Sequence, residues 1–347
     1  MIKAYPLGVL TAAVLLALGG AASASDRLLL GRPAPELRLE PGWTAERYAT
    51  GLSRPTALAF GPDGRLYVAQ ETGEIVVAAR NSTRPRVLGR GFQTPLGLAW
   101  SGTRLFISSR GRLDSLNLIG GRLRVRRTLV RGLPFGRHQQ DNVVVGRDGR
   151  LYLGSGSTCD ACSERDRRSA SILSVRPNGR GLVVVARGLR NPYGLAFQPG
   201  TGRLYATVNG QDDLGEEPAE TLVHVRPNRD YGWPRCWPSF ARKRLVGRCG
   251  GVAPPAAYLE PRSGAGGIAF ADERTAYIAL WGQYFGRKHG RTVVRVELGA
   301  DGRAQRQQVF ARGFEHPLAV LVDRAGSIYV SDWDRGIVYR LRTGASR

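Results

Sequence analysis

A repeated pattern of glycine, a short apolar run and a hairpin turn constrains the fold of this chain more than any other feature. The first copy runs from Gly51 to Phe60, turns at Asp63-Gly64 and continues into Leu66-Tyr67-Val68. The first two spacings between copies are 40 and 42 residues, and later spacings are longer. A period of about 40 residues built only from short strands is typical of four-stranded propeller blades. Five further copies follow, beginning at Gly91, Leu133, Gly188, Gly264 and Gly313.

Each copy predicts four short antiparallel strands, the innermost and most apolar one first. The expected fold class is therefore all-β: a six-bladed β-propeller of four-stranded antiparallel blades. The segment Trp43–Thr50 has no preceding blade to join. We expect it to complete the last blade beside Ile337–Leu341, because pairing of the N- and C-terminal strands leaves no open sheet edge. The predicted boundaries are a secretory signal peptide at 1–24, a lead-in at 25–42, the propeller at 43–343 and a tail at 344–347.

The first residues have the pattern of an export signal. Lys3 precedes an uncharged, largely apolar run from Ala4 to Gly20, and Ala22-Ser23-Ala24 has the small residues that a signal peptidase needs. We therefore expect a mature chain that begins near Ser25 in the periplasm or outside the cell, with no membrane span after signal removal. A retained N-terminal anchor is the alternative, although the run is short for a membrane span.

The charge of the chain is strongly positive, at a formal +23 from 51 basic and 28 acidic residues. Only Lys3, Lys243 and Lys288 are lysines, and the arginines are scattered through every segment. Nucleic-acid binders usually concentrate basic residues on one face or tail. The distribution therefore indicates a solvated arginine-rich surface, and we expect no nucleic-acid partner.

Four cysteines form two local pairs in the sequence. Cys159 and Cys162 stand in a C-x-x-C pattern, and Cys236 and Cys249 are thirteen positions apart. In an oxidising compartment, Cys159–Cys162 and Cys236–Cys249 disulfides are the simplest expectation, although four cysteines allow three connectivities. A redox-active pair and a zinc site are alternatives, but no predicted helix opens at Cys159 to lower its pKa.

The order of strands predicts which face of the ring carries a site. If the Asp-Gly turns lie on one face, the segments that precede the innermost strands and the loops between second and third strands lie on the opposite face. Propellers usually place their binding sites there, around the axis. Polar residues expected on that face include Arg54, Glu71, Gln93, Arg110, His138, Arg190, Asn191 and His316, with the loops at 157–162, 209–213, 281–284 and 332–334.

Two segments on this face suggest chemistry. His138 directly precedes an innermost strand, and imidazole is the usual general base near neutral pH; a hydrogen-bonded structural histidine is the alternative. The segment Asn209–Glu217 combines a glycine-containing turn with several carboxylates. Backbone carbonyls and carboxylates suit Ca²⁺, although a solvated acidic loop has the same composition.

Several segments, taken together and in order, resemble the glucose/sorbosone dehydrogenases, which are exported six-bladed propeller quinoproteins. The resemblance covers most of the mature chain and is strongest from His138 to Cys236. The segments that carry it are Arg137-His138-Gln139, Ser155–Cys162, Gly188–Phe197, Asn209–Gly215 and Asp230–Pro234.

The resemblance implies pyrroloquinoline quinone and Ca²⁺ as cofactors on this face. His138 would take the hydroxyl proton of a sugar while the carbon-bound hydrogen leaves as hydride to the quinone. Arg190 would contact the quinone and stabilise developing negative charge, and Gln139 and Asn191 would lie at the cofactor. Finally, the backbone carbonyls of Gly210 and Gln211 would ligate Ca²⁺.

The chain departs from this family pattern in the fifth and sixth blades. Relatives have a lysine where this chain has Thr292, and an arginine and an aspartate where it has the segment around His316 and Ala319. The resemblance implies that the lysine and the arginine would hold the carboxylates of the quinone. Arg287 and Arg291 are the cofactor-binding residues that we expect to replace them.

The function expected from the resemblance is quinone- and Ca²⁺-dependent oxidation of an aldose, a sorbosone-like sugar or a polyol. The partners would be a small-molecule sugar substrate and an unknown electron acceptor. One alternative is a non-catalytic binding module for an anionic ligand or protein that has lost its cofactor. Another is a Ca²⁺-dependent propeller lactonase, which would need side-chain carboxylates near the axis.

Overall fold

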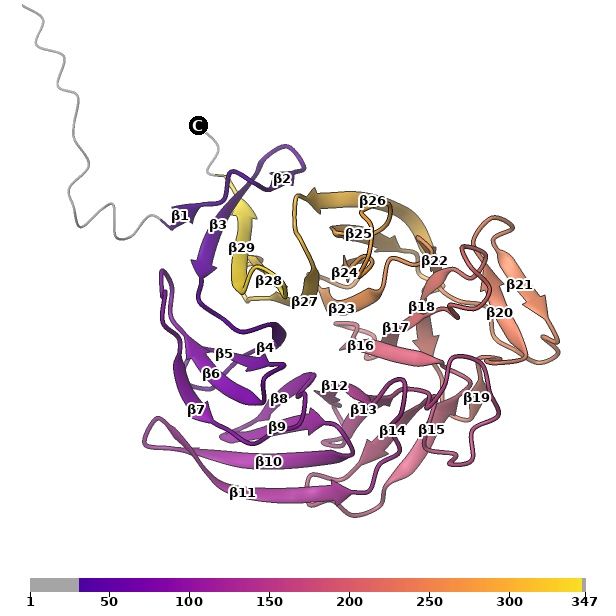
Figure 1. Cartoon of the computed structure of the whole chain (residues 1–347), viewed down its shortest axis with the longest axis horizontal. Coiled ribbons are helices and arrows are strands. Elements are labelled where there is room, and N and C mark those ends of the chain that lie inside the picture. The colour runs from indigo at the N-terminus through magenta and orange to yellow at the C-terminus, as the bar shows by residue number, and fades with distance from the viewer. Residues whose placement is uncertain (1–30, 345–347) are drawn as a thin grey trace, which may run out of the picture. The chain divides into compact units, whose positions relative to one another are not determined.

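The computed structural model describes residues 31–344, which fold into β-strands and loops without a helix (Figure 1). None of these residues belongs to a helix of the length and apolarity that crossing a lipid bilayer requires. The predicted signal peptide at 1–24, the first part of the lead-in and the last three residues of the tail lie outside the described residues.

Six antiparallel sheets stand around a common axis, as the repeats predict, and each innermost strand comes first in its blade (Figure 1). Blade 1 contains β4 (Pro55–Phe60), β5 (Leu66–Gln70), β6 (Glu74–Ala78) and β7 (Arg86–Gly89). Blade 2 contains β8 (Gly97–Ser101), β9 (Arg104–Ser109), β10 (Arg112–Ile119) and β11 (Arg122–Arg131). Blade 3 contains β12 (Gln140–Val145), β13 (Leu151–Ser155), β14 (Ser171–Val175) and β15 (Val183–Arg187).

The later blades carry the longer insertions. Blade 4 contains β16 (Asn191–Phe197), β17 (Leu204–Asn209), β18 (Glu220–Val225) and β22 (Ala257–Leu259). Blade 5 contains β23 (Ala265–Phe270), β24 (Thr275–Leu280), β25 (Thr292–Leu298) and β26 (Ala304–Arg312). Blade 6 contains β27 (Pro317–Val322), β28 (Ile328–Asp332), β29 (Ile337–Thr343) and β3 (Trp43–Ala49).

The pairing of β3 with β29 confirms the predicted closure of the ring. Ala45 lies opposite Leu341 and Glu46 opposite Arg340 in this antiparallel ladder. Glu46 is buried, and its carboxylate accepts two hydrogen bonds from Arg80, which follows β6 of the first blade. The N-terminal strand therefore joins the last blade and also connects it to the first.

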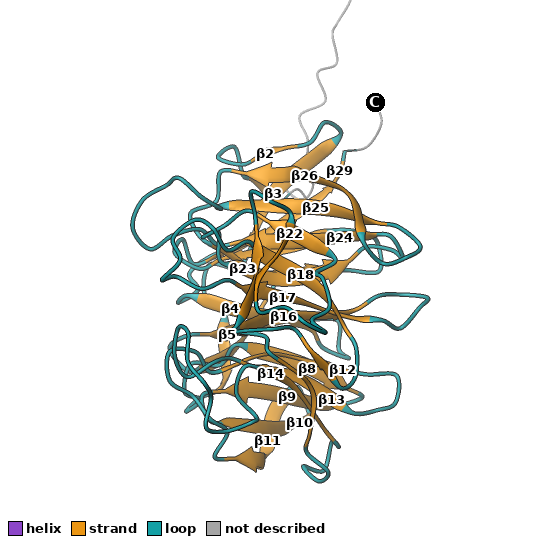
Figure 2. Ribbon diagram, turned by 90° about the vertical axis from the view of Figure 1, so that its right-hand side faces the viewer, coloured by secondary structure: helices purple, strands orange, loops and turns teal. Residues whose placement is uncertain are grey.

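Five short strands extend this plan. β1 (Arg32–Pro33) adds to blade 6 and β2 (Arg38–Leu39) to blade 5, so the described part of the lead-in pairs with the outer edges of two blades. β19 (Arg229–Asp230) lies parallel to β15, and β20 (Cys236–Ser239) pairs with β21 (Arg244–Gly247) in a separate hairpin. Figure 2 shows the strands stacked across the ring with loops projecting from both of its faces.

Hydroxyl groups of the first or second strand of one blade bind carbonyls at the innermost strand of the next blade. Thr56 of β4 donates its hydroxyl proton to the carbonyl of Pro95 at 2.6 Å, and Thr207 of β17 donates to the carbonyl of Gly266 at 2.6 Å. Ser108 of β9 donates in the same way to the carbonyl of Asp141. Each bond satisfies a buried carbonyl of the next blade, which would otherwise cost free energy.

Both predicted disulfides are present. Cys159 is bonded to Cys162 and Cys236 to Cys249, and no cysteine is free. Since each sulfur is bonded to another sulfur, none is a thiolate that could bind zinc. The first disulfide lies in the loop between β13 and β14, and the second joins the hairpin β20–β21 to the chain that follows it.

The closing strand offers a direct test of the packing. Leu341 of β29 is fully buried between blades 5 and 6. We expect Leu341→Ala to lower the free energy of unfolding by about 2–5 kcal/mol, because it removes buried methyl groups and leaves a cavity. Thr343→Ala, on the exposed end of the same strand, should change it by less than about 0.5 kcal/mol. Chemical denaturation of both variants measures the difference, and equal effects would contradict the assigned packing.

Candidate functional site

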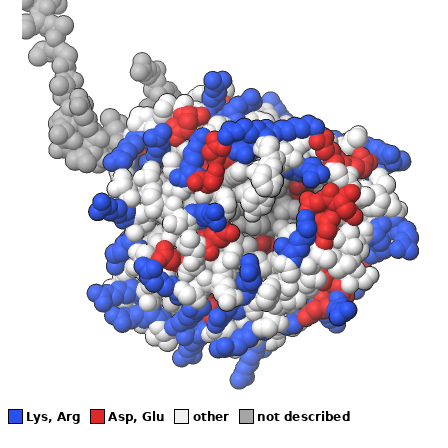
Figure 3. Space-filling view, viewed as in Figure 1, with Lys and Arg blue, Asp and Glu red and all other residues white. Residues whose placement is uncertain are grey.

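A cavity of about 750 Å³ opens at the axis of the ring. Segments that precede innermost strands and loops between second and third strands both line it, so the predicted face is the one that is hollowed. Figure 3 shows this opening on a face where basic and acidic side chains are interspersed. Each innermost strand contributes at least one residue from or next to its start, among them, in blade order, Thr56, Leu96, Asp141, Tyr193, Gly266 and Leu318.

Five of the predicted site residues are brought together at this cavity, namely His138, Gln139, Arg190, Asn191 and Gly210. The side chain of Gln211 instead borders a smaller neighbouring cavity of about 50 Å³. Gln139 accepts a hydrogen bond from Arg110 at 3.1 Å and donates one to the carbonyl of Thr94 at 2.7 Å, which fixes its amide.

Arg287 and Arg291 are not among the residues that line the cavity. Both bind the carboxylate of Glu315, Arg287 at 3.1 Å and Arg291 at 2.7 Å. Beside them, the ring of His316 packs against Trp281 with centroids 4.0 Å apart. Glu315 therefore holds both guanidiniums that we expected at the cofactor and offsets one of their two charges, and His316 is packed against an aromatic ring.

The imidazole of His138 is held in one orientation and one tautomer. Its Nδ1 lies 2.9 Å from the hydroxyl oxygen of Ser157, and that hydroxyl donates its proton to the carbonyl of Cys159 at 2.6 Å. Because a serine hydroxyl has a single proton, it must accept from His138, so Nδ1 carries the hydrogen. The lone pair of Nε2 is therefore free for a ligand in the cavity.

The electrostatic surroundings keep His138 neutral. Burial, together with the positive charges of Arg190 and Arg137, lowers the pKa of His138 from its ordinary value of 6.5 to about 3. Near neutral pH the ring is an imidazole that can accept a proton. The partner of Nδ1 is the neutral hydroxyl of Ser157, whereas a carboxylate in that position would raise the pKa of the imidazole.

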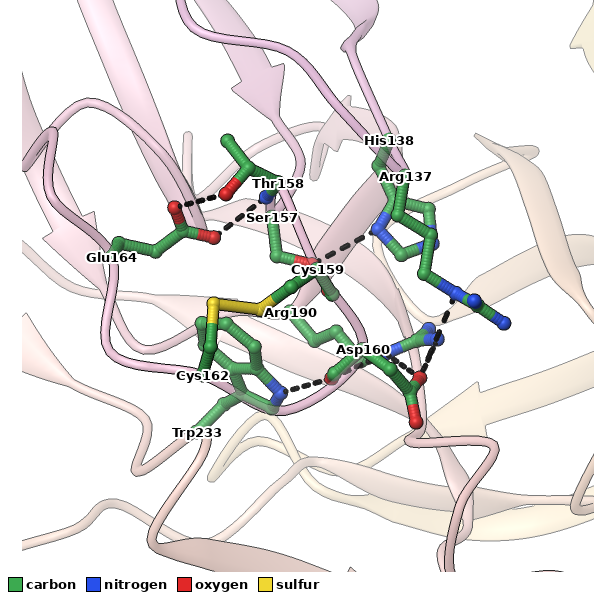
Figure 4. Close-up of a disulfide and its surroundings, with 10 residues drawn as sticks. All are labelled: Arg137, His138, Ser157, Thr158, Cys159, Asp160, Cys162, Glu164, Arg190 and Trp233. Atoms are coloured by element: carbon green, nitrogen blue, oxygen red, sulfur yellow. Dashed lines mark hydrogen bonds and ion pairs between the residues drawn. A yellow bond between two sulfur atoms is a disulfide. The ribbon is translucent and has the colours of Figure 1, made fainter.

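Arg190 is the most buried cation of the site, with 4% of its side chain exposed. Its guanidinium binds the carboxylate of Asp160 (Figure 4). Nη2 also binds Asp212 at 2.8 Å. Arg137 binds the same oxygen of Asp212 at 2.6 Å. Two cations and two carboxylates thus form a network beside His138, which satisfies the charge of a guanidinium that water does not reach.

The turn at Gly210-Gln211 has its amides held by carboxylates. The amide of Gly210 donates to Glu220 at 2.9 Å, and the amide of Asp212 donates to Asp160 at 3.1 Å. Because a trans peptide directs C=O opposite to N–H, the carbonyl of Gln211 points away from Asp160. A free carbonyl, with the nearby carboxylates of Glu220 and Asp212, is an oxygen donor set that suits Ca²⁺.

Two polar residues that the sequence analysis did not single out lie near the start of innermost strands, Asp141 of β12 and Tyr193 of β16. Asp141 is 2% exposed, and burial raises the pKa of its carboxyl group well above the ordinary value. Among the described residues, neither its Oδ2 nor the hydroxyl of Tyr193 has a hydrogen-bond partner. Glu220 is also buried, which raises its pKa to about 7. A polar residue within an otherwise apolar strand pattern was the available signal for Asp141.

Aromatic side chains form one wall of the cavity. Trp281 contacts Tyr284 and Trp333, with ring centroids 4.7 and 5.7 Å apart, and Phe285 is 94% exposed. Arg54 lies over the ring of Trp333 at 4.7 Å. The cavity therefore joins an aromatic surface to a polar side that carries His138, an arrangement that suits a ligand with both apolar and hydroxyl-bearing faces.

The titration of His138 can be measured directly. Since its pKa lies at about 3 in the folded chain and near 6.5 when unfolded, protons bind more strongly to the unfolded state between these values. The free energy of unfolding should therefore decrease as the pH falls from about 6.5 to about 3, because the unfolded state binds the proton first. NMR of the imidazole should show His138 neutral down to about pH 5. A midpoint near 6.5 would contradict the described surroundings.

Gly156 should be intolerant of a side chain. A Cβ at this position would lie 2.4 Å from the Cβ of His138 and 2.6 Å from Oδ1 of Asn191. We expect Gly156→Ala to displace both residues and to cost about 1–3 kcal/mol of stability through overpacking. Gly250→Ala is the matched control, because Gly250 is exposed and a Cβ there would meet no atom within 4 Å. Thermal unfolding with equal midpoints for both variants would contradict this close packing.

The fold is shared with solved structures of carbohydrate-active enzymes. The calcium structure of a Trichoderma reesei enzyme of family AA12 is 17% identical, with a TM-score of 0.81 over 91% of this chain and 99% of its own. The holo form of the pyranose dehydrogenase PQQ domain from Coprinopsis cinerea is 18% identical, with a TM-score of 0.76 over 90% of this chain and 98% of its own. At these identities the likeness is one of fold.

Sequence comparison is more specific. An uncharacterized protein of Borreliella burgdorferi is 21% identical over 215 residues, which cover 57% of this chain and 56% of its own length. The chain thus matches little more than half of that relative. The family model of glucose/sorbosone dehydrogenases matches residues 108–340, most of the propeller. The chain therefore belongs to the glucose/sorbosone dehydrogenase family.

Proposed function

We propose that the chain is a quinone- and Ca²⁺-dependent oxidoreductase that oxidises an aldose, a sorbosone-like sugar or a polyol. The observation that carries this proposal is the free Nε2 of a neutral His138 beside the buried guanidinium of Arg190, in a cavity large enough for a cofactor and a sugar. Family membership and the PQQ-bound and calcium structures of the same fold support it.

The residues of the cavity fit both cofactors. Arg137, Arg190 and Arg262 line it and match the carboxylates of pyrroloquinoline quinone in charge. Two oxygen acceptors are also available for a cofactor. Oδ1 of Asn191 has no hydrogen-bond partner among residues 31–344, and the carbonyl of Gln211 points away from Asp160. When bound, the quinone accepts two electrons and Ca²⁺ acts as a Lewis acid.

The protein's own part in the reaction is to move one proton and to stabilise one charge. His138 accepts the proton of the sugar hydroxyl at Nε2, since its Nδ1 already donates to Ser157. Arg190, fixed by Asp160 and Asp212, supplies a positive charge that does not have to reorganise during the reaction. The aromatic wall at Trp281 and Trp333 offers a surface on which a sugar ring can pack.

Arginines of the third to fifth blades, rather than Arg287 and Arg291, are the cations that we assign to the cofactor's carboxylates. Glu315 binds both Arg287 and Arg291, whereas Arg137 and Arg262 line the cavity. Export of the chain, predicted from residues 1–24, agrees with its two disulfides, which are typical of an oxidising compartment. The electron acceptor would then be an exported or added redox partner.

Reconstitution tests the proposal. We expect dye-linked oxidation of aldoses by the purified chain to require both pyrroloquinoline quinone and Ca²⁺. His138→Ala should lower kcat by about 10²–10⁴-fold, the usual contribution of a positioned base, while quinone binding is retained. His224→Ala is the matched control, because His224 lies on β18 and is not among the residues that line the cavity.

The alternatives give different outcomes. Failure to retain the quinone at micromolar concentrations with excess Ca²⁺ would favour the binding module for an anionic ligand. Hydrolysis of lactones with Ca²⁺ alone would favour the lactonase. Equal loss of turnover in His138→Ala and His224→Ala would contradict the assignment of the base.

A further inference from the structure

We propose that Asp160, between the disulfide-bonded Cys159 and Cys162, is a positioning residue that holds the cation-binding turn and Arg190 in register with each other. The inference rests on the proposed function for the identity of the cation. Asp160 itself lies outside the cavity lining, so it would act through the groups that it binds.

Its first contact is with the turn. The amide of Asp212 lies 3.1 and 3.2 Å from the two carboxylate oxygens of Asp160, and the amide of Asp213 lies 3.0 Å from Oδ2. Two successive amides directed at one carboxylate fix two peptide planes. The carbonyl of Gln211 then has to point to the opposite side, where a cation would meet it.

Its second contact is with the cation of the site. Oδ1 of Asp160 accepts from Nε of Arg190 at 3.1 Å and also from Nη2, while Nη2 continues to Asp212 at 2.8 Å. One carboxylate therefore joins the metal-side turn to the guanidinium. Although burial alone would raise it, these hydrogen bonds lower the pKa of Asp160 to about 2, so the group is ionised under all ordinary conditions.

The main chain of Asp160 is held as firmly as its side chain. Its carbonyl accepts from the indole nitrogen of Trp233 at 3.0 Å and from Nε of Arg190 at 3.2 Å (Figure 4). The flanking disulfide closes the loop, and Glu164 binds both the amide and the hydroxyl of Thr158. A disulfide reduces the freedom of the chain that it closes, so the carboxylate is presented in one place.

The same loop also orients the base. The carbonyl of Cys159 accepts the proton of Ser157, which in turn fixes the tautomer of His138. The geometry thus makes the Cys159–Cys162 loop a common support for three groups: the base, the guanidinium and the cation-binding turn. Supporting residues of this kind typically change metal affinity by about 10–100-fold when they are replaced.

The test measures calcium affinity without the quinone. Titration calorimetry of the purified chain with Ca²⁺ should show affinity reduced by about 10–100-fold in Asp160→Ala. Asp160→Asn should lose less calcium affinity than Asp160→Ala, because the amide oxygen of asparagine can still accept hydrogen bonds from the turn. It should still lose some affinity, because asparagine lacks the negative charge that Arg190 needs. The double variant Cys159→Ser/Cys162→Ser should also bind Ca²⁺ more weakly than the wild-type chain. Hydrogen exchange of the Asp212 and Asp213 amides should accelerate in Asp160→Ala.

Asp166→Asn is the control, since Asp166 lies in the same loop and binds only Arg168 among neighbouring side chains. It should leave calcium affinity and amide exchange unchanged. Unchanged exchange and affinity in a folded Asp160→Ala would overturn the inference. If the wild-type chain bound no Ca²⁺, the proposed function would fail instead, and the amide exchange of Asp212 and Asp213 would still decide whether Asp160 holds the turn.

Discussion

The pairing of β3 with β29 is the constraint on which the rest of the structure depends. A propeller blade buries both of its faces against neighbours, so a ring with one unpaired blade would expose apolar surface and an open edge. The antiparallel ladder from Trp43 to Ala49 removes that edge, and Glu46 extends it to Arg80 of the first blade. Once the ring is closed, the starts of six innermost strands meet at the axis. The cavity is therefore a consequence of closure, and its chemistry depends on which residues stand at those six starts.

Charge compensation determines what that cavity can do. A buried guanidinium such as Arg190 is stable only with counter-charges, and Asp160 and Asp212 provide them. The remaining positive field of Arg190 and Arg137 acts on His138, whose pKa it lowers together with burial. A histidine with a carboxylate partner would be protonated more readily, whereas the hydroxyl of Ser157 only orients the ring. The network thus keeps His138 neutral and Arg190 fixed through the same few contacts.

The sequence was sufficient to predict the blades, the closure and both disulfides, because each depends on local patterns or on the absence of any other partner. It also placed His138, Arg190, Asn191 and Gly210 on one face, since strand order alone decides which loops meet. The roles assigned to Arg287 and Arg291 rested on charge and approximate position. The pairing of both with Glu315 depends on how loops of blades 5 and 6 approach each other, which no local pattern encodes. Asp160 was likewise hidden, because its partners lie 30 and more positions away along the chain.

The cations on the two sides of the cavity differ in how their charge is offset. Arg287 and Arg291 share the single carboxylate of Glu315, which offsets one of their two charges, and His316 makes an edge contact with Trp281 beside them. Arg137 and Arg190, by contrast, lie next to His138 and to the turn at Gly210-Gln211, and the carboxylates of Asp160 and Asp212 offset both of their charges. With the proposed function, a polyanionic cofactor beside His138 would meet guanidiniums that already have counter-charges. Because Asp160 and Asp212 already offset the charges of Arg137 and Arg190, the proposed Ca²⁺ would supply the positive charge that such a cofactor needs, and the binding of each would favour the binding of the other.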